Sequence, residues 1–257
     1  MSDSHHANAF LIDMDGVLVK GETPIEGAAE FIDRLHDSGK PFLLFTNNSK
    51  YSSESHSTRL SGMNLNIPAK DIFTSAMATA QFLINQNSNG SAFVIGESGL
   101  FTPLQETGYT LTKENPDYVV LGELETYDFR AICKGVELIQ DGAIFIATNP
   151  DEYSPGKFSI EPGCGAVAAM IEKASGKRPY FIGKPNPLMM RYALRTLGTR
   201  AQDAVIIGDR MDTDVIAGLE NGMTTYLVLS GVTSKEEIKN FPYRPTEVFG
   251  SVVEIFP

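Results

Sequence analysis

Short apolar runs, each ending in a polar residue or glycine, recur along the chain and alternate with segments of helical periodicity. Several of these runs are apolar at every position, which is typical of strands that are covered on both faces. The pattern predicts strands over residues 9–13, 41–47, 91–96, 117–122, 143–149, 180–183, 204–209 and 224–229.

Segments with apolar residues at helical spacing separate these strands. Residues 27–39 carry Ala29, Ile32 and Leu35 at such spacing and end in Gly39, a common helix stop. Similar patterns predict helices over residues 186–198 and 212–223, and one that begins within 49–60. This alternation of strands and helices predicts an α/β fold, a doubly wound parallel sheet with helices on both faces.

The long middle of the chain does not fit a simple crossover between two strands of that sheet. Residues 76–180 contain several predicted strands and helices of their own, and we interpret them as an inserted, smaller α/β cap domain. Residues 1–75 and 181–257 would then form the core domain, with hinges near 73–79 and 177–183.

Composition narrows the class of partner. The 257 residues carry a formal net charge of −11, which disfavours nucleic acid and anionic membranes as partners. The apolar runs are too short for a membrane-spanning helix. Cys133 and Cys164 are the only two cysteines, too few for a disulfide framework, so we expect free thiols and a cytoplasmic location.

Candidate functional residues follow the predicted strands. Open parallel sheets bind ligands beyond the carboxyl ends of their strands, so the residues just after each strand are the best candidates for functional residues. They are Asp13, Asp15, Thr46, Asn47, Asn48, Asn149, Asp151, Lys184 and Asp209.

Two carboxylates interrupt the apolar run "FLIDMDGVLV" at residues 10–19. In an extended segment Asp13 and Asp15 lie on the same side, and their charges would repel by roughly 3 kcal/mol at 5–6 Å. A third carboxylate, Asp209, should converge on them from another strand end. Oxygen ligands without nearby histidine or cysteine favour Mg²⁺, and Gly16 permits a sharp turn after the pair.

Two further strand ends suit the binding of an anion. "FLLFTNNSK" ends in Thr46, followed by Asn47 and Asn48, where a hydroxyl, peptide N–H groups and a helix N-terminus could hold a phosphate. In "FIGKPNPLMM", Lys184 stands just before a predicted helix, where its charge opposes the helix dipole at a cost of about 0.3–1 kcal/mol. Such a local conflict is a hint of function.

Four segments together resemble the motifs of the haloacid dehalogenase-like (HAD) hydrolases. "DMDGVL" is similar to the first motif, Thr46 to the second, Lys184 in "GKP" to the third, and "GDRMDTD" to the fourth. They occur in the order of that superfamily and span Asp13 to Asp214. Such a set is far more specific than any single motif.

The resemblance implies a role for each matching residue. Asp13 would be the nucleophile that becomes phosphorylated, and Asp15 the general acid and then base. Mg²⁺ would be bound by Asp13, the carbonyl of Asp15, and Asp209. Asp214 would lie behind the metal or hold Lys184, which with Thr46 and the backbone of Asn47 would bind the phosphate. We assign Asp212 to helix capping instead.

Segments of the expected cap and of the chain's end sharpen the resemblance to the NagD-type branch. They are "TSAMATAQFL", "VVLGE", "FIATNPD", "GCGAVAAMIEK" and "LVLSGV". The branch implies a Mg²⁺-dependent phosphatase of nucleoside monophosphates or sugar phosphates, whose cap closes over the substrate and excludes water. Asn149 and Asp151 would face that substrate, although an ordinary Asn-Pro-Asp turn explains each residue alone equally well.

Other functions remain open at this point. A phosphomutase of the same superfamily would share the motifs. A non-enzymatic phosphorylation switch would also gather acidic residues, a Ser or Thr and a Lys around Mg²⁺, although receiver domains are shorter and lack a cap. A binding protein with a silent site is a third alternative. We expect a small phosphomonoester as the partner and allow for a homo-oligomer.

Overall fold

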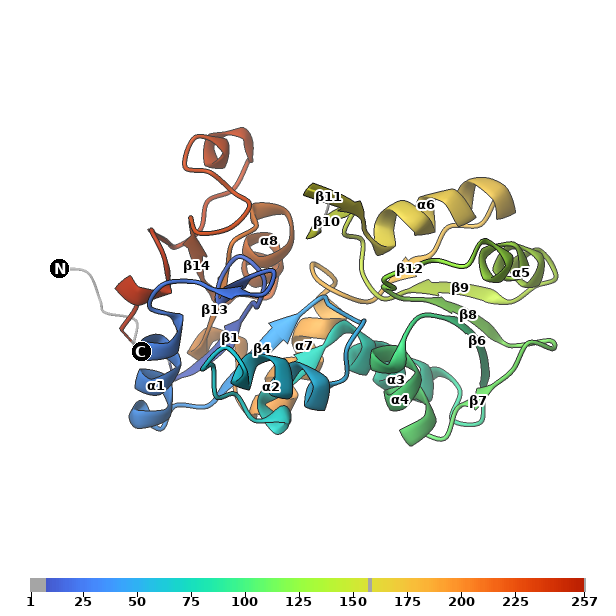
Figure 1. Ribbon diagram of the computed structural model, residues 1–257, viewed down its shortest axis with the longest axis horizontal. Coiled ribbons are helices and arrows are strands. Elements are labelled where there is room, and N and C mark those ends of the chain that lie inside the picture. The colour runs from blue at the N-terminus through green and yellow to red at the C-terminus, as the bar shows by residue number, and fades with distance from the viewer. Residues whose placement is uncertain (1–7, 157–158, 257) are drawn as a thin grey trace. The chain divides into compact units, whose positions relative to one another are not determined.

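The computed structural model describes residues 8–156 and 159–256, which fold into two compact units (Figure 1). The first unit comprises residues 8–46, 56–73 and 184–256, and the second comprises 47–55 together with the described part of 74–183. This division differs from the ranges expected from the sequence in three short segments. Residues 47–55, 74–75 and 181–183 belong to the second unit.

A six-stranded sheet forms the centre of the first unit, in the order β15-β14-β13-β1-β4-β5. Strand β1 pairs in parallel with β4 and β13, and β14 pairs in parallel with β13 and β15. The strands are β1 (Ala9–Ile12), β4 (Phe42–Thr46), β5 (Ile72–Thr74), β13 (Ala204–Gly208), β14 (Thr224–Val228) and β15 (Glu247–Phe249).

Helices cover both faces of this sheet because side chains alternate along each strand. Phe10 and Ile12 of β1 belong to one apolar cluster with Phe31 and Leu35 of helix α1. Leu11, between them, is equally buried and points to the other face, where α7 packs against β4 and α8 against β14. The helices are α1 (Ala28–Ser38), α2 (Ser53–Ser61), α7 (Pro187–Leu197) and α8 (Ile216–Glu220).

Short elements complete the first unit. A hairpin of β2 (Val19–Lys20) and β3 (Thr23–Pro24) follows β1. Helical turns are η1 (Ala69–Asp71), η2 (Ala201–Asp203), η3 (Met211–Val215), η4 (Glu237–Asn240) and η5 (Val252–Glu254).

The second unit contains its own parallel sheet of five strands, in the order β12-β9-β8-β6-β7. Its core lies between the sheet and the pair α5 and α6, where Val119 and Leu121 meet Ile132 and Ile171. The strands are β6 (Ser91–Ile95), β7 (Thr110–Leu111), β8 (Tyr118–Leu121), β9 (Ile144–Ala147) and β12 (Tyr180–Phe181).

In the described part of the second unit, four helices and one hairpin accompany this sheet. The helices are α3 (Ser75–Gln86), α4 (Ser98–Glu106), α5 (Phe129–Gln140) and α6 (Cys164–Ser175). The antiparallel hairpin consists of β10 (Tyr153–Gly156) and β11 (Ser159–Pro162), and it packs against α6.

The predicted fold class is confirmed: a doubly wound parallel sheet accompanies a second, smaller α/β unit. Strands β5 and β15 were not predicted, because a run of three residues carries too little pattern. The helix expected over 212–223 is shorter and starts at Ile216, after the π-helical turn η3. No helix in the described part of the chain is long and apolar enough to cross a membrane.

Candidate active site

The first sheet changes its winding direction between β1 and β13. From β1 the chain passes through α1 to β4 on one side, and from β13 it passes through α8 to β14 on the other. At such a switch point the two crossovers leave a crevice beyond the carboxyl ends of the strands. Asp13 directly follows β1, and Asp209 directly follows β13. The topology therefore brings these two carboxylates to the crevice.

Lys184 joins the first unit next to these carboxylates. Its ammonium lies 2.8 Å from Asp13 Oδ1, 2.8 Å from Asp214 Oδ1 and 3.0 Å from the Phe45 carbonyl oxygen. The Lys184 residue is 1 % exposed, so solvent screens these interactions little. The predicted conflict with the helix dipole is thus resolved by two carboxylates, and α7 begins close behind at Pro187.

Burial and neighbouring charges both shift the pKa values of Asp13 and Lys184. Burial raises the pKa of Asp13 well above its usual range, while Lys184 pulls it down and Asp214 and Asp209 push it further up. Burial lowers the pKa of Lys184, but the attraction of Asp13 and Asp214 outweighs it and the net shift is upward. Lys184 therefore stays charged at neutral pH.

Asp209 is held by the chain that follows β14. Its Oδ2 accepts a hydrogen bond of 2.6 Å from the Val232 peptide N–H, which favours the charged carboxylate. Burial and the nearby Asp214 act more strongly and raise the pKa of Asp209 to about 7. The site thus concentrates more negative charge than its own cation neutralises.

Three carboxylates of the first unit could hold a metal ion together. Within the described ranges, Asp13, Asp209 and Asp214 each offer an oxygen, and these oxygens lie within 4.8 Å of one another. With Lys184 the group carries a formal charge of −2. Oxygen donors and an excess of negative charge fit a hard divalent cation such as Mg²⁺.

Asp214 has a second set of contacts that fixes its orientation. Besides Lys184, it accepts hydrogen bonds from the Arg210 peptide N–H at 3.2 Å and the Thr213 hydroxyl at 3.3 Å. Asp212, by contrast, pairs with the Arg210 guanidinium at the surface. Asp214 is thus oriented towards Lys184, whereas Asp212 lies outside the cluster.

Asp15 and Thr46 also lie at carboxyl ends of the first sheet. Asp15 stands two residues beyond Asp13 and is partly exposed, while Gly16 adopts a φ of 79° and turns the chain. Thr46 is the last residue of β4 and is 2 % exposed. The sharp turn predicted at Gly16 is therefore present.

The structure groups the remaining candidates within the second unit. The Asn47 carbonyl accepts a hydrogen bond of 2.9 Å from the Asn149 side chain, and the Asn47 side chain donates one of 3.0 Å to Asp151. Asn149 is fully buried, whereas Asp151 and Asn48 are partly exposed. Asn48 accepts from the Lys50 peptide N–H at 3.1 Å. Their predicted contacts with substrate stay a prediction.

Residues of the loop after β14 were missed as part of the site. Val232 and Thr233 donate to Asp209, and Ser230 donates to the Gly16 carbonyl oxygen. A signal was present, since 224–229 was predicted as a strand and "SGVT" follows at its carboxyl end. The same reasoning that selected Thr46 applies to this loop.

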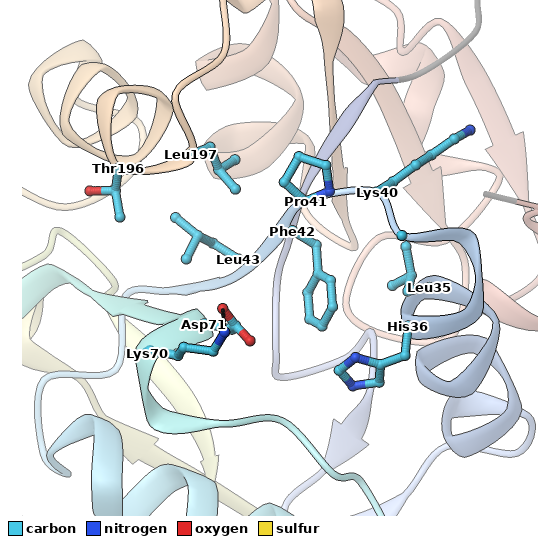
Figure 2. A pocket seen from close by; sticks show the side chains of 11 residues that line it. Leu35, His36, Lys40, Pro41, Phe42, Leu43, Lys70, Asp71, Thr196 and Leu197 are labelled. Atoms are coloured by element: carbon cyan, nitrogen blue, oxygen red, sulfur yellow. Dashed lines mark ion pairs between the residues drawn. The ribbon is translucent and has the colours of Figure 1, made fainter.

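A separate cavity of about 380 Å³ lies at the amino ends of the strands of the first sheet, away from the acidic cluster (Figure 2). It opens beside the start of β4, at Pro41, Phe42 and Leu43, and is also lined by His36 and Asp71. None of the residues in the acidic cluster lines it. The chemistry therefore points to the crevice at the carboxyl ends rather than to this cavity.

Two family models match the chain. Residues 10–110 match a model described as haloacid dehalogenase-like hydrolase, and residues 181–255 match one described as HAD-hydrolase-like.

Curated relatives match almost the whole length. A dihydroxyacetone phosphatase from Corynebacterium glutamicum is 49 % identical over 96 % of this chain and 90 % of its own. The ribonucleotide monophosphatase NagD of Escherichia coli is 40 % identical, over 95 % of this chain and 96 % of its own.

Solved structures agree in fold with these relatives. NagD from Escherichia coli superposes with a TM-score of 0.89 at 39 % identity, covering 97 % of this chain and 98 % of its own. A 4-nitrophenylphosphatase from Thermotoga maritima gives a TM-score of 0.92 at 31 % identity, with coverages of 97 % and 96 %.

Proposed function

This chain belongs to the haloacid dehalogenase-like hydrolases, in their NagD-type phosphatase branch, and from that premise we propose that it hydrolyses small phosphomonoesters with Mg²⁺ through an aspartyl phosphate. The membership makes it an enzyme that acts on phosphoric monoester bonds. The observation that carries the proposal is the buried cluster of Asp13, Asp209 and Asp214 around Lys184.

In the proposed reaction Asp13 attacks phosphorus. The new bond forms from a carboxylate oxygen of Asp13 while the bond from phosphorus to the leaving oxygen breaks, and Asp15 gives its proton to that oxygen. A water molecule then attacks the aspartyl phosphate, loses a proton to Asp15 and releases phosphate, which restores Asp13. The partial exposure of Asp15 suits a group that exchanges protons with substrate and water.

Charge neutralisation is the main task of the other residues. Lys184, next to Asp13, would neutralise the charge of the phosphoryl oxygens, and the Thr46 hydroxyl and the following Asn47 and Asn48 stay predicted as phosphate ligands. Bound Mg²⁺, held by Asp13, the Asp15 carbonyl and Asp209, would neutralise the phosphoryl charge. Asp214 orients Lys184.

The substrate class rests on the names of the relatives. They are called dihydroxyacetone phosphatase, ribonucleotide monophosphatase, 5′-nucleotidase and acid sugar phosphatase. These substrates share a phosphate monoester on a small polar molecule, which is the class that we propose here. Asn149 and Asp151 stay predicted as substrate contacts. Cys133 and Cys164 are both free thiols, which supports the expected cytoplasmic location.

A panel of phosphomonoesters tests the proposal. Dihydroxyacetone phosphate, nucleoside monophosphates, sugar phosphates and 4-nitrophenyl phosphate are incubated with Mg²⁺, with and without a chelator, and kcat/KM is measured from released phosphate. We expect turnover that the chelator abolishes. An isomeric product without free phosphate would indicate a mutase, and an aspartyl phosphate that persists for minutes would indicate a switch.

A further inference from the structure

We propose that Ser230–Thr233, here called the strap, is a positioning element that holds the Asp209 carboxylate and the Gly16 loop in place for a divalent cation. This inference rests on the proposed function and deepens it. It concerns only residues of the first unit, and it assigns a role to a loop that touches the candidate metal ligand without supplying one.

The strap donates hydrogen bonds to both the side chain and the backbone of Asp209. The Val232 peptide N–H donates to Asp209 Oδ2 at 2.6 Å, and the Thr233 peptide N–H donates to the Asp209 carbonyl oxygen at 3.1 Å. Two neighbouring N–H groups thus fix one residue at two points. Because the strap holds Oδ2, the carboxylate group has a fixed orientation. The lone pairs of Oδ1 and the second lone pair of Oδ2 therefore point in fixed directions, where a cation can bind them.

The strap also reaches the first acidic loop and the turn after Asp209. The Ser230 hydroxyl donates to the Gly16 carbonyl oxygen at 2.7 Å. Gly16 directly follows Asp15, whose own carbonyl is one of the expected metal ligands. The Thr233 hydroxyl oxygen accepts from the Met211 peptide N–H at 3.3 Å. One short segment therefore connects two loops that are far apart in sequence.

Glycines allow the three segments to meet. A methyl group on Gly231 would overlap the Asp209 carboxylate, and so would one on Gly16. The same position on Gly16 would lie 3.0 Å from the Gly231 Cα atom. No side chain fits between these backbones, so the Asp209 carboxylate is confined on the side of the strap.

Residues that orient metal ligands without binding the metal alter its affinity by about 10- to 100-fold when they are replaced. The strap has the features of such residues, since it makes one short hydrogen bond to a carboxylate and packs closely against it. Loss of the Ser230 hydroxyl or the Thr233 hydroxyl should loosen one end of it while leaving every metal ligand in the sequence.

The test is Mn²⁺ binding to the full chain, followed by electron paramagnetic resonance, together with phosphate release. Ser230→Ala and Thr233→Val should each weaken Mn²⁺ binding about 10-fold and raise the Mg²⁺ concentration for half-maximal turnover by the same factor. KM for the phosphomonoester at saturating metal should stay within about two-fold. Ser230→Thr, which keeps the hydroxyl, should restore Mn²⁺ affinity.

Ser234→Ala is the matched control, because Ser234 directly follows the strap, is exposed and donates hydrogen bonds to Glu237. It should bind Mn²⁺ like the parent. If Ser230→Ala and Thr233→Val fold and also bind Mn²⁺ like the parent, the strap inference is wrong while the proposed function stands. If the parent itself neither binds Mn²⁺ nor releases phosphate, the proposed function fails first.

Discussion

The Lys184 ammonium lies 2.8 Å from Asp214 Oδ1, and both residues are almost completely buried. An ammonium has three protons to donate, and here each has an acceptor: Asp214, Asp13 and the Phe45 carbonyl oxygen. A cation with all three donors engaged has little freedom to move. This arrangement places Lys184 as a fixed charge beside the expected nucleophile.

Replacing Lys184 should damage both stability and activity. Lys184→Met leaves Asp13 and Asp214 buried without their cation, and breaking such a pair costs about 3–5 kcal/mol. We expect a loss of unfolding free energy of that order in urea titrations, and turnover reduced by more than about 100-fold.

The surface pair Arg200 and Asp203 provides the control. Its N–O distance is also 2.8 Å, but Arg200 is largely exposed, so Arg200→Ala should cost only about 0.2–1 kcal/mol. Equal losses in the two variants would mean that burial does not determine the strength of the Lys184 pair.

Asp13→Asn should separate chemistry from folding. The amide has nearly the same shape as the carboxylate but cannot form an acyl phosphate, so phosphate release should fall below detection. Because burial already disfavours the charged form of Asp13, its neutral replacement should keep the melting temperature or raise it. Circular dichroism melting and phosphate release are measured on the same preparation.

Asp212→Asn is the matched change for this experiment, since Asp212 lies in the same motif as Asp209 but outside the cluster. It should retain turnover within about two-fold. Normal turnover in Asp13→Asn would show that Asp13 is not the nucleophile.

The sequence correctly located the candidate residues that follow a strand end. Asp13, Thr46 and Asp209 were selected because parallel strands direct their carboxyl ends to one edge, and the structure puts all three there. Lys184 was selected for its conflict with a helix dipole, and its two carboxylate partners explain how the conflict is tolerated. Local rules sufficed because each residue stands beside its own regular element.

Local sequence patterns could not predict contacts between segments that are far apart in the sequence. Ser230 meets Gly16 across 214 positions of sequence, and no periodicity encodes that meeting. Asn149 was predicted as a substrate contact or part of an ordinary turn, and neither interpretation included its full burial or its hydrogen bond to Asn47, 102 positions away. The position of Tyr180–Phe181 likewise depends on pairing with β9, which local pattern does not specify.

Gly16→Ala should reduce metal binding and turnover far more than an alanine substitution at another glycine with a positive φ. Gly16 has a φ of 79°, and a Cβ atom there would overlap the Asp209 carboxylate. Gly39 has a similar φ of 66° but no atom within 4 Å of the added Cβ. Gly39→Ala should therefore cost only the backbone strain, about 1–2 kcal/mol, and keep turnover.

Gly16→Ala adds a steric conflict at Asp209, the proposed metal ligand, so Mn²⁺ binding and phosphate release should both fall by more than about 10-fold beyond any change seen in Gly39→Ala. Binding and turnover are measured at a temperature where both variants are folded. If the two alanines behave alike, the close contact at Gly16 has no functional consequence.

The two cysteines should differ sharply in reactivity, although one of them stands where thiols are often activated. Cys164 is the first residue of α6, and a helix N-terminus by itself lowers a thiol pKa. Burial opposes this and prevails, raising the pKa of Cys164 to about 12, whereas Cys133 is exposed. At pH 8 only about one Cys164 in 10⁴ would be a thiolate.

A chromogenic disulfide reagent should therefore titrate one thiol rapidly in the folded chain and the second only in denaturant. Cys133→Ser should remove the rapid phase, and Cys164→Ser should leave it unchanged. Two rapid thiols in the folded parent would show that the helix N-terminus outweighs burial.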